Sequence, residues 1–211
     1  MINQGHLLSG EQANRNTHEF SVFSQFGKDG VLQYLMQILE IKNQLFIEFG
    51  VEDFTESNCR FLMMNDNWCG FVIDGSNKNI SRLRSSYYFW KYDLNTTCTF
   101  IDQSNINELL AKSGFDYGSG VMSIDLDGID FFILASIKDG RPRILICKCN
   151  PLFGPTAKVT VPYDPTFQQF QQHHSGLYCG ASLLVICSVA KDMGYVLVDV
   201  NSAGHNAFFV R

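Results

Sequence analysis

The stretch Leu45-Phe46-Ile47-Glu48-Phe49-Gly50 decides the fold of this chain. Apolar residues surround a single acid, and a glycine follows, which is typical of a short strand that is buried on both faces of a parallel sheet and ends in a turn. The pattern repeats from Gly70 to Ile73, where Asp74 and Gly75 stop the apolar run. Three further strands are expected, one ending around Thr99 to Ile101 and the others at Val121 to Ile124 and Arg143 to Cys147.

Stretches with helical spacing separate these strands. From Asp29 to Ile41 the apolar residues recur every three and four positions, which predicts an amphipathic helix packed on a sheet. Other helices are expected over about 56–65, 78–85, 104–112, 129–137 and 181–193. Strands that alternate with helices predict an α/β fold with a doubly wound, mostly parallel sheet. Two last β-rich runs, Tyr195 to Val200 and Ala207 to Val210, predict an antiparallel hairpin that completes seven strands.

Composition favours a single domain over residues 1–211. With 45% hydrophobic and 18% charged residues, the chain can bury one full core. We expect an N-terminal helical segment over about 20–43. The region of about 151–176 is rich in proline and lacks periodicity, which predicts an insertion that could act as a lid.

Charge and cysteine usage exclude several classes of function. The formal net charge is −5, whereas duplex DNA and anionic membranes call for a basic face. Seven cysteines are an odd number scattered through apolar runs, as expected of reduced thiols. The stretch from Met1 to Glu19 has no basic-then-apolar pattern, and no apolar run reaches the roughly 18 to 20 residues of a membrane span. We therefore expect a cytoplasmic protein with neither a nucleic-acid nor a membrane partner.

Polar residues gather where the predicted strands end. In open α/β sheets, ligands bind in the crevice outside the carboxyl ends of the strands. Five residues are expected at that edge: Glu48, Asp74, Asp102, Asp125 and Asn150.

The loop after the first strand suits a sulfonium cofactor better than a dinucleotide. It holds the single glycine Gly50, not G-x-G-x-x-G, and its acids Glu52 and Asp53 would repel a pyrophosphate. A glycine at this point lets the backbone approach a ligand closely. Asp74 lies where a carboxylate could accept hydrogen bonds from the ribose hydroxyls of an adenosine, although it could equally be a helix cap beside Ser76 or Asn77.

The string Ser123 to Asp130 carries three carboxylates directly after an apolar strand. Oxygen ligands this dense suit a hard divalent ion, which Asp125, Asp127 and Asn150 could hold. The alternative is one ligand-binding acid and two acids that cap a helix. Lys148 could act as a base if desolvation lowers its pKa, could itself fill a cation's place, or could be an exposed residue at a strand end.

Histidines in the insertion are candidate bases. His173 and His174 could take the proton from a hydroxyl, because the pKa of histidine lies near neutral pH. His205, in the hairpin turn, is a weaker candidate. Cys147 and Cys149 alternate on one strand and so face opposite sides, which argues against a zinc pair.

Taken in order, several strings resemble FkbM-like methyltransferases over nearly the whole chain. They are Ser24 to Gly30, Ile47 to Gly50, Glu56 to Asn58, Gly70 to Gly75, Ser123 to Asp130, Val161 to Asp164, Gly180 to Leu183 and Asn206 to Val210. The resemblance implies a class I, Rossmann-like methyltransferase fold, S-adenosyl-L-methionine as cofactor and O-methylation of a sugar hydroxyl, as in enzymes of bacterial capsule and surface-polysaccharide clusters. The implied substrate is a small sugar or sugar nucleotide.

That resemblance also implies roles for residues. The implied cofactor-binding residues are Gln25, Glu48, Gly50, Asn58, Asp74, Ser76, Asp102 and Asp125, with Asp125 nearest the sulfonium. Tyr178 and Asn206 would contact substrate, and Asp125, His173, His174 and Lys148 would serve catalysis. Relatives carry E-x-N after the fifth strand, whereas this chain has Lys148-Cys149-Asn150. A Mg²⁺ or Mn²⁺ site of Asp125, Asp127 and Asn150 would therefore lack one carboxylate.

Two other functions remain open at this point. Asp125-Leu126-Asp127 could be the D-x-D motif of a metal-dependent glycosyltransferase or phosphatase. The glycine-poor loop and Lys148 could instead mark a non-catalytic module that only binds a cofactor.

Overall fold

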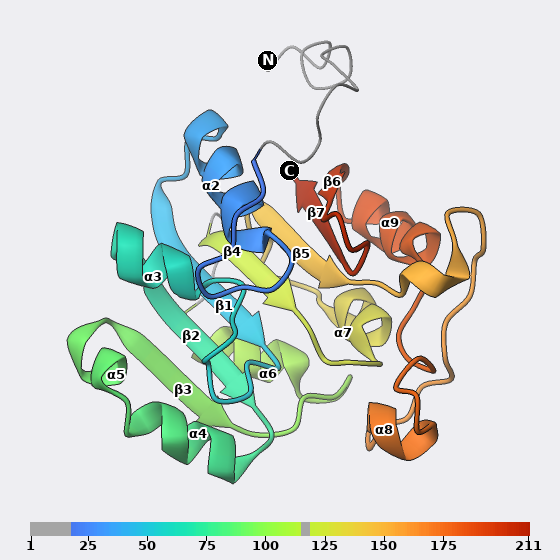
Figure 1. Ribbon diagram of the computed structural model, residues 1–211, viewed down its shortest axis with the longest axis horizontal. Helices are drawn as coiled ribbons and strands as arrows, with labels where there is room; N and C mark the ends of the chain where they lie inside the picture. Colours follow the sequence, from blue (N-terminus) through green and yellow to red (C-terminus); the bar gives the residue numbers. More distant parts are fainter. Residues whose placement is uncertain (1–17, 115–118) are drawn as a thin grey trace.

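A seven-stranded sheet forms the centre of the molecule, in the order β3-β2-β1-β4-β5-β7-β6 (Figure 1). The computed structural model describes residues 18–114 and 119–211, so residues 1–17, most of the polar N-terminal stretch, lie outside it. The strands are β1 (Asn43–Phe49), β2 (Cys69–Asp74), β3 (Leu94–Cys98), β4 (Ser119–Ile124), β5 (Ile144–Lys148), β6 (Val196–Val200) and β7 (Asn206–Val210). The pairs among β1 to β5 are parallel, and β7 pairs antiparallel with β5 and β6. The doubly wound sheet and its C-terminal hairpin are confirmed.

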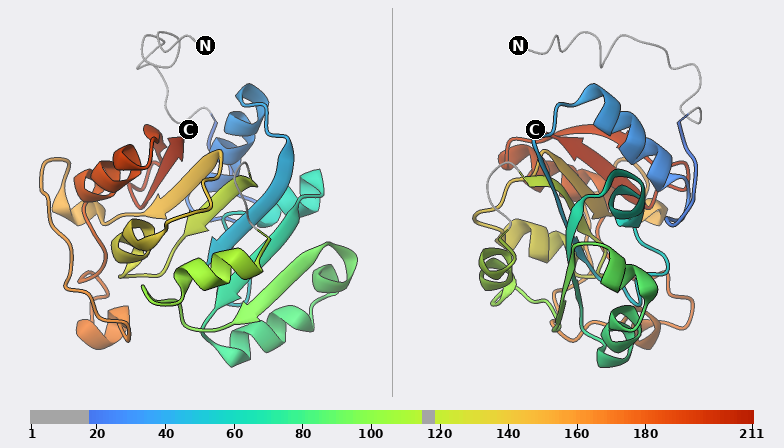
Figure 2. Two further views of the ribbon diagram at one scale, coloured as in Figure 1. Left: turned by 180° about the vertical axis from the view of Figure 1, so that it is seen from behind. Right: turned by 90° about the vertical axis from the view of Figure 1, so that its left-hand side faces the viewer.

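Helices cover both faces of the sheet, as Figure 2 shows. One face carries α2 (Lys28–Ile38), α3 (Arg60–Asp66), α4 (Asn77–Arg84) and α5 (Tyr87–Lys91), whose apolar residues share one core. The other face carries α6 (Ile106–Lys112), α7 (Asp130–Ser136) and α9 (Leu183–Asp192), which share a second core. Burial of the central strands on both faces explains why their sequences read as continuous apolar runs.

Alternation along each strand assigns its side chains to the two cores. In β1, Phe46 packs in the core under α2 and α3, whereas Ile47 and Phe49 pack in the core under α7 and α9. In β5, Ile144 and Ile146 belong to the first core, and Leu145 and Cys147 belong to the second. Cys147 and Cys149 also share the second core. The expectation that they face opposite sides is wrong, because residues two positions apart along a strand direction point to the same face.

The segments between strands differ from the sequence expectation at three places. The third strand ends at Cys98, before Thr99, and α5 follows α4 without having been expected. The helix expected from Glu56 begins only at Arg60, because the preceding residues form a loop around Glu48. The insertion of about 151–176 holds a 3₁₀ helix, η2 (Pro151–Phe153), and one helical turn, α8 (Gln169–Gln172). Within the described residues, no helix is long and apolar enough to cross a membrane.

Candidate functional site

Two adjoining cavities lie at the edge where β1, β4 and β5 end. Their volumes are about 470 Å³ and 360 Å³, and we call them the larger and the smaller cavity, and together the crevice. Both are lined by Gln25, Lys28, Asp125, Asp127, Lys148 and Gln169. The crevice therefore occupies the position where ligands bind in open α/β sheets, as predicted.

Strand register brings the polar groups of the crevice to one face of the sheet. Glu48 pairs with Ser123, and Lys148 pairs with Asn206. Residues paired across strands point to the same side, and alternation places these four on the side of α2 and α3. Lys28, at the start of α2, meets them there, because its Nζ donates a 3.3 Å hydrogen bond to Asn206 Oδ1.

Glu48 is a buried anchor for the loop that follows β1. Its carboxylate accepts hydrogen bonds from Ser57 Oγ at 2.6 Å and from the Asn58 N–H at 2.7 Å. Asn58 in turn donates from Nδ2 to Ser123 Oγ at 2.8 Å, which ties the loop to β4. Burial raises the pKa of Glu48, and the hydrogen bonds that it accepts oppose that rise. Glu48 and Asn58 therefore form one wall of the smaller cavity.

Gly50 turns the chain against the end of β4. Its φ is +74°, and a Cβ at this position would lie 1.9 Å from the carbonyl oxygen of Asp125. The Asp125 N–H donates to the Phe49 carbonyl at 3.3 Å, so the two strand ends touch. A glycine is needed here both for its backbone conformation and for this close approach.

Lys148 lies between two carboxylates. Its ammonium is 2.7 Å from Asp125 Oδ1 and also donates a hydrogen bond to Asp127 Oδ1. Burial by itself would lower the pKa of Lys148, but Asp125 and Asp127 raise it above the ordinary lysine value. A raised pKa disfavours the base role, which requires a lowered one. Of the three readings of Lys148, the geometry supports the one in which its ammonium fills a cation's place.

The proposed metal ligands Asp125, Asp127 and Asn150 are bonded to other groups of the chain. The parts of the chain that the structure describes contain no group of three or more His, Cys, Asp or Glu side chains placed to hold a metal ion. Asn150 uses its Nδ2 on the carbonyls of Leu177 and Cys179, and its Oδ1 accepts from the Leu152 N–H. It thus anchors the insertion. The D-x-D alternative meets the same obstacle, because Lys148 already pairs both acids.

Asp130, the first residue of α7, binds the loop that follows β4. Its two carboxylate oxygens accept hydrogen bonds from the N–H groups of Leu126 and Gly128 at 2.7 and 3.0 Å. Complete burial, followed by the charge of Asp125, raises the pKa of Asp130 to about 7. Asp130 therefore holds the loop that presents Asp125 and Asp127 to the crevice.

Three residues expected to bind the cofactor act in turns and caps. Asp74 accepts from the N–H groups of Glu52 and Ser76 at 2.9 and 2.7 Å, and Ser76 Oγ caps α4 through the Asn79 N–H. Asp102 accepts from the N–H groups of Ser104 and Asn105 in the turn before α6. None of Asp74, Ser76 and Asp102 lines the two cavities, although Asp74 touches Glu52, which lines the smaller one.

His205, and neither His173 nor His174, reaches the crevice. His173 and His174 are exposed, their ring centroids lie 4.2 Å apart in a tilted arrangement, and neither lines a cavity of the crevice. Tyr178 is 47% exposed and also lines neither cavity. His205 lines the larger cavity with its ring stacked on Phe26 at 5.5 Å. Burial, followed by the charges of Lys148 and Lys28, lowers the pKa of His205, which favours the neutral imidazole.

Lys28 and Asn206 form a buried polar pair in the larger cavity. Lys28 is 6% exposed, and burial lowers its pKa although Asp125 and Glu48 oppose the change. Asn206 is 1% exposed, and its Nδ2 has no hydrogen-bond partner among the described residues. Sequence reasoning missed Lys28, Glu52 and Gln169 as lining residues. For Lys28 the signal was weak, since a lysine that opens a helix is usually exposed.

Comparison with solved structures shows the fold. The sheet and helices match the class I, Rossmann-like methyltransferase fold. A putative sarcosine dimethylglycine methyltransferase from Galdieria sulphuraria aligns at a TM-score of 0.54 with 11% identity, over 82% of this chain and 62% of that one. An O-methyltransferase family protein from Burkholderia thailandensis aligns at 0.51 with 11% identity, over 99% and 66%. An S-adenosylmethionine-dependent methyltransferase from Clostridium acetobutylicum aligns at 0.51 with 10% identity, over 90% and 91%.

Sequence comparison adds nothing to this: no protein-family model matches the chain, and no curated protein sequence matches it significantly. The structural neighbours are S-adenosylmethionine-dependent methyltransferases, and at these identities they establish the fold alone.

Proposed function

We propose that the crevice binds S-adenosyl-L-methionine and transfers its methyl group to a sugar hydroxyl. The observation that carries this proposal is the pair of adjoining cavities at the carboxyl edge of a methyltransferase sheet, with Gly50 and Asp125 in contact at their junction. When bound, the cofactor supplies an electrophilic methyl group on a positively charged sulfur. One cavity then holds the donor and the other the acceptor.

The smaller cavity suits the cofactor. Glu48, Glu52 and Asp125 line it, and acids favour a sulfonium and disfavour the pyrophosphate of a dinucleotide. Burial, together with Asp127 and Asp74, raises the pKa of Glu52. A positive ligand beside this acidic group would relieve that repulsion. Asp74 accepts the Glu52 N–H through Oδ2, and this oxygen can accept a second hydrogen bond, from a ribose hydroxyl.

The larger cavity suits the acceptor. Asn206 Nδ2 and Lys28 Nζ are buried donors there, so they can hold an acceptor oxygen and stabilise its developing negative charge. His205 lines the same cavity, and its lowered pKa favours the neutral imidazole that can take the hydroxyl proton. Donors and a base around one cavity favour a hydroxyl substrate, and the resemblance to FkbM-like enzymes supplies the sugar.

A metal ion is not part of this proposal. The donor set does not fit one, because Lys148 already neutralises Asp125 and Asp127, and Asn150 is used in anchoring the insertion. The cation between these acids is the protein's own ammonium. Methyl transfer is therefore expected to be unchanged by a chelator.

Thermal unfolding with cofactor analogues tests the proposal. S-adenosylhomocysteine should raise the melting temperature, whereas NAD⁺ or a nucleotide sugar alone should not, because only a ligand that binds the native state stabilises it. Asp125→Asn should weaken the shift and abolish methyl transfer, with Asp102→Asn as the matched control outside the crevice. Methyl transfer to a panel of sugar nucleotides then identifies the acceptor. No shift with S-adenosylhomocysteine would overturn the cofactor assignment, and a shift without any transfer would leave a binding module.

A further inference from the structure

A third cavity, of about 400 Å³, lies at the edge of the sheet opposite the crevice. It is formed where β1 and β5 begin and where β7 ends, by residues that include Lys42, Arg141, Arg143 and Arg211. We call it the basic cavity. From Ile144 beside it, β5 runs to Lys148 in the crevice, and at ~3.3 Å per residue this separates the two sites by roughly 15 Å. A ligand in the basic cavity would not overlap the crevice.

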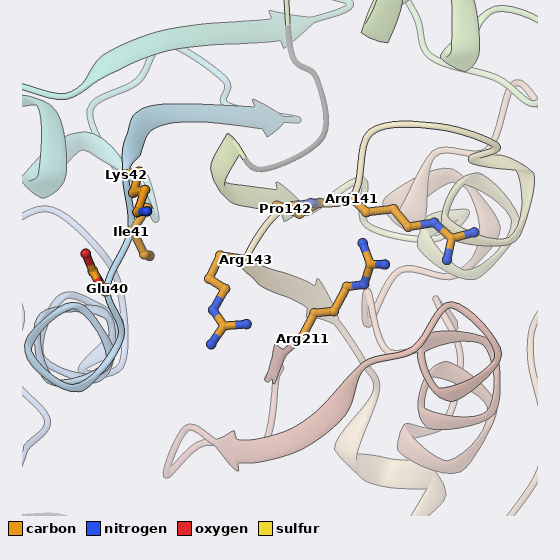
Figure 3. A pocket seen from close by; sticks show the side chains of 7 residues that line it. All are labelled: Glu40, Ile41, Lys42, Arg141, Pro142, Arg143 and Arg211. Atoms are coloured by element: carbon orange, nitrogen blue, oxygen red, sulfur yellow. The ribbon is translucent and has the colours of Figure 1, made fainter. Parts of the chain in front are cut away.

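Positive charge is concentrated at this cavity, although the chain as a whole carries a negative net charge. The protein has 16 Lys and Arg against 21 Asp and Glu, yet four of those cations line this one cavity. Glu40 is the single acid in its lining. Figure 3 shows Glu40 and Lys42 on the side of α2, Arg211 extending toward Arg141, and Arg143 between Arg211 and the side of α2. Like charges that gather in one hollow repel one another, so an anion between them would be stabilised.

Two of the arginines have unused donors. Arg141 donates from Nη1 to the Met193 carbonyl at 2.9 Å, but the Nε atoms of Arg141 and Arg143 are buried and find no hydrogen-bond partner among the described residues. No described carboxylate forms an ion pair with Lys42, Arg141 or Arg143. The positive charges of Lys42, Arg141 and Arg143 are therefore not neutralised by a described carboxylate, and an anion in the cavity would be attracted to them.

We propose that the basic cavity binds the diphosphate group of a small phosphorylated ligand. Guanidinium groups match phosphate oxygens in bidentate geometry, and several of them on one hollow favour two linked phosphates over one. The volume lies within the range of small-molecule sites, roughly 300 to 1,000 Å³. The assignment stands independently of the proposed methyl transfer, because it involves no residue of the crevice.

Calorimetric titration with inorganic pyrophosphate and with inorganic phosphate tests the site on the whole chain. Pyrophosphate should bind about tenfold or more tightly than phosphate, and Arg143→Gln should weaken pyrophosphate binding by at least about tenfold. Lys78→Gln, on the exposed surface of α4, removes the same charge and should leave the affinity unchanged. Lys28→Gln, in the crevice, should also leave it unchanged.

Three results would overturn the assignment. They are an Arg143→Gln variant that binds pyrophosphate like the unmodified chain, a loss of binding in Lys28→Gln, and capture of a single-stranded oligonucleotide without any pyrophosphate binding. Lys42→Gln serves as a second variant if Arg143→Gln does not fold, since Lys42 precedes β1 and forms no ion pair with a described carboxylate.

Discussion

The ammonium of Lys148 lies between Asp125 and Asp127, whose carboxylates could otherwise bind a divalent ion. Lys148→Glu replaces that charge with a third carboxylate beside Asp125 and Asp127. Carboxylate oxygens grouped in this way bind Mn²⁺ and Mg²⁺. We expect the variant to bind Mn²⁺ where the unmodified chain does not, measured by titration calorimetry.

Lys148→Gln is the control for that experiment, because it removes the ammonium without adding a ligand. If Lys148→Glu and Lys148→Gln bind Mn²⁺ equally, or if the unmodified chain binds it as well, Lys148 does not occupy a cation's place in the way that the structure indicates.

His205 should carry proton removal. His205→Ala is expected to lower the rate of methyl transfer by roughly 10²- to 10⁴-fold, the usual contribution of a general base. Because a base must be unprotonated and the pKa of His205 lies below its ordinary value of 6.5, activity should fall on acidification with a midpoint below that value. The measurement is the initial rate against pH.

His173→Ala is the matched control, since His173 is exposed and lines neither cavity. An equal loss of activity in both variants, or an unchanged pH profile in His205→Ala, would show that His205 is not the base. The histidines of the insertion, His173 and His174, would then be the candidates again.

The contact between the ends of β1 and β4 depends on Gly50 having no side chain. Gly50→Ala forces a Cβ to within 1.9 Å of the Asp125 carbonyl oxygen at a φ of +74°. Left-handed strain and overpacking together should lower the free energy of unfolding by about 2–5 kcal/mol. Urea denaturation measures this loss.

Gly154 separates the two causes. Its φ is +68°, and a Cβ there would meet nothing within 4 Å. Gly154→Ala should therefore lose only the strain of its own backbone conformation (φ +68°, ψ −179°), about 1–3 kcal/mol. Equal losses at the two glycines would mean that the strand ends have room to separate.

Most strands and helices could be predicted from the sequence, because the spacing of apolar residues shows which stretches are buried and in which secondary structure. The run from Leu45 to Phe49 and the spacing from Asp29 onward correspond to β1 and α2. The start of α3 was not predictable, since the choice of Ser57, Asn58 and Cys59 to bond with Glu48 depends on a residue already buried in the sheet. Local propensity carries no information about such a tertiary contact.

Stability of the whole molecule should depend on pH through Asp130. Its pKa is raised from 3.8 to about 7 in the folded chain, so its contribution is full at acidic pH and is lost as pH rises through 7. Relative to Asp130→Asn, the unmodified chain should lose on the order of 2–4 kcal/mol between about pH 4 and pH 7. Urea denaturation across that range measures the difference.

Asp164→Asn gives the matched control for that titration, because Asp164 is an exposed turn residue whose pKa is lowered by its hydrogen bonds with Thr166. If the curves for the unmodified chain and Asp130→Asn stay parallel from pH 4 to 7, Asp130 remains ionised throughout and its burial does not govern stability.

The candidate site was predictable only to the level of the sheet edge. The predicted strand ends identified Glu48 and Asp125 as site residues. Which other side chains lie beside them depends on the register between strands that are distant in sequence, because the register sets which residues face the same side. Asp102 and Asp74 follow their strands as expected, yet they bond to their own turns. Lys28 and His205 arrive from opposite ends of the chain, and no local pattern marks such a meeting.

The contact between Lys28 and Asn206 in the crevice cannot form until nearly the whole chain has been synthesised. Lys28 Nζ and Asn206 Oδ1 meet across 178 positions of sequence. A chain emerging from the ribosome therefore exposes a buried lysine and the open flank of β5 until residue 206 has cleared the exit tunnel. Chaperones that shield unpaired strands would be needed most during that interval, and no acceptor could be held before it ends.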